Sequence, residues 1–270
     1  MRSITVIAGV ALVCVTVVPA SAATVHHETR FSVKFGGIEI GQAGFRISFD
    51  DHTYTLKGSG KTTGLAEWFS DGRGEVESFG DIIANVAKPK IHRVSVTESK
   101  KTESLELAFA GEKVDKIKIE SSKPKKKRVA PKYVPVEAGH LSAVLDPASS
   151  MIIPMSGSDA ADPAKVCNQV FPIFDGETRY DIRLSYKSTK PVDTDGYNGW
   201  AHVCKMRYVP VAGHKKNHRR VKEMAANQHM EISLAPMGGV SVFTPIRIVV
   251  GTKYGRFVAD PMRFSSVSDD

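Results

Sequence analysis

The stretch that decides the fold is Phe31-Ser32-Val33-Lys34-Phe35-Gly36-Gly37-Ile38-Glu39-Ile40. Apolar residues alternate with polar ones on both sides of the Gly36-Gly37 pair, as in two strands that each bury one face. Because glycine readily adopts positive φ, the pair suits the tight turn of a hairpin. The sequence therefore predicts two antiparallel strands here.

The same alternation continues along most of the chain. Phe45, Ile47 and Phe49 resume it a few residues later. Further on, Ile117 and Ile119 are expected to face the core while the lysines between them face solvent. No long helical segment separates these runs, which favours an antiparallel sheet over a parallel one. Further strands are predicted at residues 91–97, 104–109, 115–120, 178–186, 201–208, 230–234, 240–250 and 254–264.

Only two short helices are expected, at residues 138–145 and 164–170. The first should stop at Asp146-Pro147, and the second should follow Asp162-Pro163, because proline suits the first turn of a helix. Pro245 lacks a backbone donor, which indicates an edge position or a β-bulge in its strand. The prediction is a single, mainly β antiparallel domain over residues 24–270 with one or two short helices.

Gly58-Ser59-Gly60-Lys61-Thr62 is similar to the end of a phosphate-binding loop. The complete pattern requires a glycine where this chain has Thr55, and it requires a long helix that the sequence does not offer. We interpret the segment as a glycine-rich turn. No nucleotide or other cofactor is expected.

The first 23 residues have the three parts of a secretory signal peptide. Arg2 supplies the positive charge, residues 4–19 form an apolar run, and Ala20-Ser21-Ala22-Ala23 offers small residues for cleavage after Ala22 or Ala23. No later apolar run is long enough to span a bilayer. We expect an exported protein without a transmembrane segment in its mature chain.

Of the three cysteines, Cys14 falls within this leader, which leaves Cys167 and Cys204 in the mature chain. In an oxidising compartment, an even pair without other thiols predicts a disulfide. Two alternatives stay open at this point. Both thiols are free and buried, or Cys204 is a nucleophile that uses His202, two residues away on the same face of a strand.

The chain is basic, with a formal net charge of +8, and its cations are clustered. Outside the cytoplasm, the polyanions that attract cations are lipid phosphates, lipopolysaccharide and acidic glycans rather than nucleic acid. The alternative is an ordinary solvated charged surface. The residues proposed to bind an anionic ligand are Lys125, Lys126, Lys127 and Arg128, in a Pro/Lys loop at 122–135, and Lys215, Lys216, Arg219 and Arg220.

Signals for metal or catalytic sites are weak. His214 and His218 have the spacing of metal ligands on a helix, but the neighbouring cations oppose a divalent ion, so no metal is expected. The chain has no Gly-x-Ser-x-Gly elbow and no His-Glu-x-x-His helix, so no catalytic residue is assigned. Asp175, Asp181 and His202 are among the few groups that a hydrolase could use, although a turn entering a strand explains the two aspartates equally well.

Several segments spread over the chain resemble one family, and the most specific piece is Phe174-Asp175-Gly176 followed by Arg179-Tyr180-Asp181. On these residues the chain resembles the DUF3108 family of exported bacterial proteins. The resemblance implies a periplasmic or envelope-associated protein of the Gram-negative type, folded as a strongly curved open β-sheet or incomplete β-barrel. It implies no activity. The other matching segments are Phe35-Gly36-Gly37-Ile38-Glu39-Ile40-Gly41, Thr63-Gly64-Leu65, Leu145-Asp146-Pro147-Ala148-Ser149-Ser150, Val170-Phe171-Pro172-Ile173 and Cys204-Lys205-Met206-Arg207-Tyr208.

Two functional hypotheses follow. An incomplete barrel can leave a concave apolar face, and basic loops at its rim would attract a lipid, lipopolysaccharide or glycan that bears phosphate. The first hypothesis is therefore a non-enzymatic envelope protein that binds such an amphiphilic or anionic component, or docks a periplasmic protein. The alternative is a hydrolase or transferase acting on cell-wall or glycan material. An apolar concave face favours the first hypothesis, whereas converging carboxylates and histidines favour the second.

Overall fold

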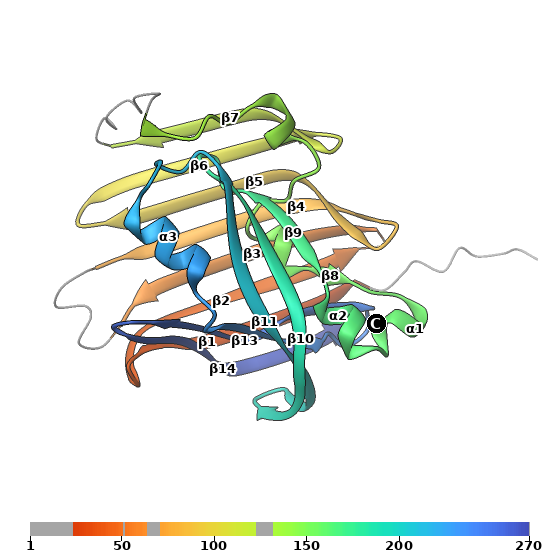
Figure 1. The fold of residues 1–270 in the computed structure, drawn as a ribbon. Coiled ribbons are helices and arrows are strands. Elements are labelled where there is room, and N and C mark those ends of the chain that lie inside the picture. The colour runs from red at the N-terminus through yellow and green to blue at the C-terminus, as the bar shows by residue number, and fades with distance from the viewer. Residues whose placement is uncertain (1–23, 51, 64–70, 123–131, 270) are drawn as a thin grey trace, which may run out of the picture.

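The computed structural model describes residues 24–50, 52–63, 71–122 and 132–269. Within these ranges, a 14-stranded antiparallel sheet curls strongly around itself (Figure 1). Its main path runs in the order β7-β6-β5-β4-β3-β2-β1-β14-β13-β12-β11-β10-β9, and β8 pairs with β13. The strands are β1 (Val25–Phe35), β2 (Ile38–Asp50), β3 (Thr53–Thr62), β4 (Arg73–Ile83), β5 (Val86–Glu98), β6 (Lys101–Ala110), β7 (Lys113–Ser121), β8 (Ile153–Pro154), β9 (Val170–Phe174), β10 (Arg179–Thr194), β11 (Tyr197–Ala212), β12 (Met230–Pro236), β13 (Val242–Thr252) and β14 (Gly255–Ser268).

The predicted hairpin at Gly36-Gly37 is confirmed. Phe35 pairs with Ile38 across the turn, where the φ angles of Gly36 and Gly37 are 59° and 91°. Both strands are longer than the apolar run that predicted them, because outward-facing polar residues continue the backbone ladder on both sides. The same holds for most later strands.

The curved sheet leaves a seam between its edge strands, β7 and β9. The segment 142–145 fills this seam in the described part of the chain. Ser142 forms a bridge to Lys113 of β7, and Leu145 forms one to Ile173 of β9. The predicted incomplete barrel is therefore confirmed, with an irregular segment in place of a closing strand.

The core lies inside the curl of the sheet. Phe45, Ile47 and Leu56 belong to its largest buried cluster. A second cluster joins Leu107 of β6 to Phe174 of β9, so the two edges of the sheet also meet through their side chains. Each large apolar side chain buried in this way stabilises the fold by about 1.5–3 kcal/mol.

Helices are few and short in the described residues: the 3₁₀ helices η3 (Ala138–Leu141) and η4 (Ser149–Met151), and α1 (Gly157–Ala160), α2 (Pro163–Cys167) and α3 (Arg219–Ala226). The predicted helix at 138–145 is wrong in its second half, because Ser142 and Leu145 pair with the sheet edges instead. The one predicted at 164–170 ends at Cys167, since Val170 begins β9. None of these helices is long and apolar enough to cross a membrane.

The interpretation of Gly58–Thr62 as a turn is wrong, because these residues belong to β3. Gly58 faces the interior, and a Cβ there would lie 2.8 Å from Cγ1 of Val76. The glycine therefore serves close strand packing rather than a change of direction.

Two local predictions hold. Pro245 pairs with Leu234 while Arg247 pairs with Ser233, so β13 bulges between them. The disulfide between Cys167 and Cys204 joins α2 to β11. This bond rules out Cys204 as a free nucleophile.

Candidate functional site

The concave face of the sheet is packed at one end of the barrel and open at the other. Along β5 the exposed fraction of the inward-facing side chains rises from 1% at His92 to 46% at Val96. On the edge strand β7 it rises from 4% at Val114 to 42% at Ile117 and 40% at Ile119. Apolar side chains thus continue along the inner wall beyond the end of the core.

We call this open wall the apolar cup. Ile117 and Ile119 point inward as predicted, because they pair with inward-facing residues of β6. Both side chains stay exposed, since β7 is the edge of the sheet. The cup consists of Val76, Val94, Val96, Leu105, Ile117 and Ile119, and register places Val76, Val94, Leu105 and Ile119 in one row across β4 to β7.

The inner end of the cup is where the turn between β9 and β10 meets β6. Gly176 has a φ of +91°, and a Cβ on it would lie 2.5 Å from Cδ1 of Leu105, so only glycine allows this approach. Asp175 holds the turn by accepting hydrogen bonds from the backbone N–H groups of Glu177 (3.0 Å) and Thr178 (2.7 Å). The turn role considered for Asp175 is thus what the structure shows.

Helix α3 lies at the open end of the barrel, where β5 turns into β6 (Figure 1). Next to it, two regions far apart in the sequence pair with each other. Tyr133 forms a bridge to Lys215, and the backbone N–H of Val134 donates to the carbonyl of His214 at 2.9 Å. The end of the Pro/Lys loop is therefore paired with the second basic cluster.

A pocket of about 440 Å³ lies between α3 and this paired segment. Apolar residues, including Val134, Pro210 and Val221, form part of its wall. Pro210 lies on the same face of β11 as Cys204, which is the concave face. The pocket therefore adjoins the hollow of the barrel. Its basic lining residues are His214, Lys215, Lys216, His218 and Lys222.

The cations around this pocket differ in how far they are neutralised. Arg219 Nε lies 3.1 Å from Glu223 Oε1, and Lys253 Nζ lies 2.9 Å from the same oxygen. Hydrogen bonds from Lys253 and Arg219 outweigh the small effect of burial and lower the pKa of Glu223. Four exposed cations form no ion pair with a carboxylate of the described residues, and we call them the basic rim: Lys215, Lys216, Arg220 and Lys222.

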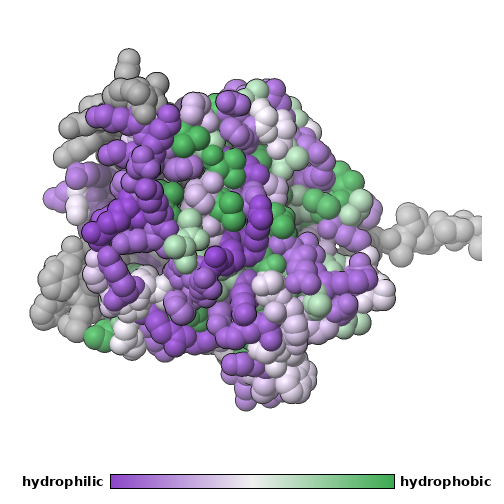
Figure 2. Space-filling model, in the orientation of Figure 1, coloured by the Kyte–Doolittle hydropathy of each residue, from purple (hydrophilic) through white to green (hydrophobic). Residues whose placement is uncertain are grey.

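The other predicted cluster, Lys125 to Arg128, lies outside the described residues. Lys132 follows it closely in the sequence, and its carbonyl accepts a hydrogen bond of 2.8 Å from the backbone N–H of Lys216. Figure 2 shows the surface over α3 as strongly hydrophilic, with apolar residues gathered beside it in the middle of the same face. The site thus joins a charged rim to an apolar interior.

The residues considered for a hydrolase do not converge. Asp181 pairs in register with Val209, seven residues along β11 from His202, which corresponds to roughly 23 Å at the rise of a strand. Asp181 Oδ1 accepts a hydrogen bond of 2.6 Å from Arg179. Burial lowers the pKa of His202, but no carboxylate of the described residues forms an ion pair with it. The carboxylate of Asp175 accepts the backbone hydrogen bonds of its own turn.

A buried polar cluster in the closed end of the barrel was not predicted. Asp146 accepts hydrogen bonds from the hydroxyls of Ser78 (2.8 Å) and Ser149 (2.5 Å), and His92 Nδ1 lies 2.9 Å from its Oδ1. Tyr54 donates to Ser149 at 2.6 Å. Burial opposes ionisation of Asp146, but hydrogen bonds from His92 and Ser149 outweigh burial and lower its pKa.

Serine, histidine and aspartate also make up hydrolytic triads. In this cluster, however, no member is more than 1% exposed, so a substrate cannot reach the hydroxyls. The cluster instead fastens the segment Asp146-Pro147-Ala148-Ser149-Ser150 to β3, β4 and β5. Its role is structural.

Comparisons with known proteins agree with this architecture. A similar solved structure is the crystal structure of a beta-barrel-like protein of the domain of unknown function DUF1849 from Brucella abortus, with a TM-score of 0.50 and 11% sequence identity. The match covers 90% of this chain and 98% of that one, and at this identity it concerns the fold alone. No curated protein matches the chain. The model of the family described as a protein of unknown function (DUF3108) matches residues 30–260, so this chain belongs to the DUF3108 family.

Proposed function

We propose that this chain is an exported protein of the Gram-negative periplasm that binds an envelope amphiphile with a phosphate-bearing head group and does not convert it chemically. The observation that carries the proposal is that the apolar cup and the basic rim both lie at the open end of the barrel. An amphiphile likewise joins an apolar chain to a charged head group.

The cup suits the apolar part of such a ligand. Val96, Ile117 and Ile119 are between 40% and 46% exposed although they lie on the inner face of the sheet. A hydrocarbon chain laid against them would gain about 0.8 kcal/mol for each methylene group removed from water. No carboxylate or histidine is among the residues of the cup, so the cup supplies no side chain that could act as a general acid or base.

The rim suits the anionic part. The four cations of the rim form no ion pair with a carboxylate of the described residues, which favours binding of a phosphate, and each contributes about 1 kcal/mol near an anionic lipid surface. A hydrolase or transferase is the weaker alternative, because Asp181 and His202 lie far apart and Asp146 is sealed in the core.

The test of the rim replaces Lys215, Lys216, Arg220 and Lys222 with glutamine. Binding to vesicles that contain anionic phospholipid should weaken several-hundred-fold at low salt, and the difference should shrink as salt screens the charges. A matched control removes the same charge elsewhere, with the exposed residues Lys113, Lys116, Lys190 and Lys205 changed to glutamine, and should keep most of the binding. Equal losses in the two variants, or no binding by the wild type, would refute the proposal.

The test of the cup replaces Val96 and Ile119 with aspartate. These variants should lose binding of a dispersed long-chain alkyl phosphate, because a carboxylate in the cup repels the chain and the head group alike. A control with Val267→Asp and Ile83→Asp changes residues that are 60% and 54% exposed elsewhere on the molecule. If cup and control variants bind the probe equally, the cup does not hold the chain.

The run Lys125 to Arg128 is tested in the same assay. If it belongs to the rim, changing all four residues to glutamine should weaken vesicle binding, and combining this change with the rim variant should weaken it further. If the quadruple variant binds as the wild type does, this run is ordinary solvated surface.

A further inference from the structure

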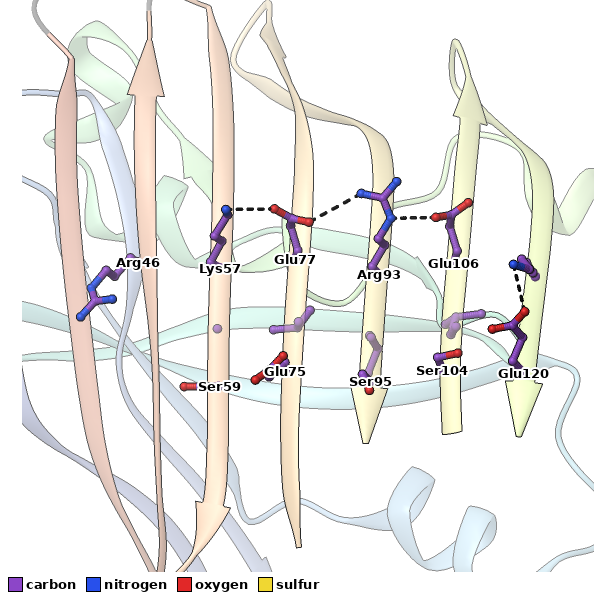
Figure 3. A pocket seen from close by; sticks show the side chains of 15 residues that line it. Arg46, Lys57, Ser59, Glu75, Glu77, Arg93, Ser95, Ser104, Glu106 and Glu120 are labelled. Carbon is purple, nitrogen blue, oxygen red and sulfur yellow. Dashed lines mark hydrogen bonds and ion pairs between the residues drawn. The ribbon is translucent and has the colours of Figure 1, made fainter. Parts of the chain in front are cut away.

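A second surface, on the convex side of β1 to β7, carries an arrangement of charges that the fold itself does not require. Two adjoining grooves of about 570 Å³ and 460 Å³ cross this face. Their charged side chains, such as Glu75 and Glu77, flank the inward-facing Val76, so they point away from the apolar cup (Figure 3). The residues shared by both grooves are Arg46, Lys57, Ser59 and Glu75.

One half of this surface is electrically neutralised. Across β3 to β6, charges of opposite sign alternate from strand to strand, as Figure 3 shows. Lys57 Nζ lies 3.3 Å from Glu77, and Arg93 lies 3.6 Å from Glu77 and 2.7 Å from Glu106. Opposite charges in cross-strand pairs stabilise a sheet, so this half needs no ligand.

The other half, over β14 and β1 to β4, also contains cross-strand pairs of like charge, although Glu28 faces Arg46 in register. Like charges face each other directly across strands, and such pairs destabilise a sheet. Five cations and two carboxylates line the groove in this half. The like-charged pairs in register are Arg30 with Arg263, Arg46 with Lys57, and Lys61 with Arg73.

Internal carboxylates compensate only part of this charge. Glu28 lies within 2.9 Å of Arg30, 3.0 Å of Arg46 and 3.1 Å of Arg263. Asp195 also pairs with Arg263, and Glu77 pairs with Lys57. Lys61 and Arg73 form no ion pair with a carboxylate of the described residues. Lys61 and Arg73, which face each other in register, are therefore the two cations of this groove that no carboxylate of the described residues neutralises.

The shape and lining of the groove indicate the class of anion. Gly44 and Ser59 lie side by side at its centre and leave room between the cations. Figure 3 shows Ser59, Glu75, Ser95 and Ser104 in one row that leads from there along the larger groove. Aromatic and long apolar side chains are nearly missing from the outward-facing lining, which disfavours a lipid.

We propose that this groove binds an acidic saccharide, with its oxyanion held by Lys61 and Arg73 and its hydroxyl groups hydrogen-bonded along the neighbouring row of Ser59, Glu75, Ser95 and Ser104. This site is separate from the amphiphile site, because it lies on the opposite face of the sheet. It does not depend on the function proposed for the cup and rim.

The test changes Lys61 and Arg73 to glutamine and measures binding of trigalacturonate and glucose 6-phosphate by isothermal titration at low salt. Loss of two charge-assisted contacts should weaken the binding of at least one of these probes roughly tenfold or more. The melting temperature should stay the same or rise, because the change removes a like-charged pair. A loss of binding that comes only with unfolding would overturn the proposal.

A control with Arg93→Gln and Lys118→Gln removes the same charge from the neutralised half and should bind within about twofold of the wild type, since its cations already have partners. The rim variant at α3 should also bind the saccharides normally. Equal losses in all three variants would show that the attraction is non-specific. If inorganic phosphate binds as tightly as both saccharides, the groove does not recognise the sugar part of the ligand. Either result, or no binding by the wild type, overturns the proposal.

Discussion

His27 is a buried imidazole that is satisfied without a charged partner. Its Nδ1 lies 2.9 Å from the hydroxyl of Ser266 and its Nε2 lies 2.8 Å from that of Thr29. The ring also packs edge-on against Phe264, with 4.3 Å between ring centroids. Burial lowers the pKa of His27 to about 4, and the charge of Glu28 offsets only part of this effect. The folded protein therefore holds this histidine neutral.

This pKa makes the stability depend on pH. Between pH 6.5 and about pH 4 the unfolded chain binds a proton at this position and the folded chain does not, so the free energy of unfolding should fall as the pH decreases through this window. The loss from His27 should be about 3 kcal/mol in total, and none of it occurs above the unfolded pKa. Urea unfolding at pH 7.5 and pH 4.5 measures it.

In the same experiment, His27→Gln should show a smaller difference between the two pH values than the wild type. His229→Gln, a change at an exposed histidine, should keep the wild-type difference. A full wild-type difference in His27→Gln would mean that other groups cause the acid sensitivity.

Two aspartates show why some roles could be predicted from the sequence and others could not. The donors to Asp175 lie two and three residues further along the chain, so the pattern Asp-Gly-x-Thr was enough to suggest a turn. Asp146 depends on Ser78 and His92, which come from β4 and β5. No local pattern marks such partners, because only the curl of the sheet brings them together.

At the scale of elements, most strands were predictable, whereas β4, β9 and α3 were not. Strand positions follow from the alternation of apolar residues, which the buried side of each strand requires. Helix α3 is only two turns long and none of its side chains is fully buried, so its apolar positions Val221, Met224 and Ala225 are too few to predict a helix from the sequence. Glu223 forms one ion pair within the helix, with Arg219, and a second with Lys253 from the β13–β14 turn. The second ion pair forms only when the chain is folded.

The disulfide links two such elements, the short helix α2 and the long strand β11. In the chain-entropy model, a cross-link with a sequence separation of 37 stabilises the fold by about 4 kcal/mol. Cys204→Ser should therefore lower the melting temperature, and Cys167→Ser should lower it by the same amount. The double variant should be no less stable than either single variant, because each change breaks the same bond.

Thiol titration of the denatured wild-type protein, purified from the periplasm, checks this bond directly. It should detect no free thiol until a reductant is added. Two reactive thiols before reduction, or a melting temperature that is unaffected by both single changes, would contradict the expected stabilisation.

At the scale of the whole molecule, the curvature of the sheet decides what is exposed. The alternation along β7 correctly predicted that Ile117 and Ile119 point inward, but it could not predict that these side chains stay 42% and 40% exposed. This exposure depends on how far β9, β10 and α3 extend over the concave face of the sheet. The convex groove was missed for a similar reason, because the charges that line it come from strands distant in the sequence and become neighbours only through strand register.

The last prediction concerns the place where this molecule works. Strand β1 begins at Val25, and the carbonyl of Thr24 already accepts a hydrogen bond of 2.9 Å from Asp269, so cleavage after Ala22 or Ala23 would leave the sheet complete. Intact-mass analysis of the periplasmic fraction should find a chain that starts at Ala23 or Thr24. Deleting residues 2–23 should keep the protein in the cytoplasm, where Cys167 and Cys204 should titrate as free thiols because that compartment is reducing. A full-length chain recovered from the cytoplasm of wild-type cells, or a lipid attached to Cys14, would contradict export by this route.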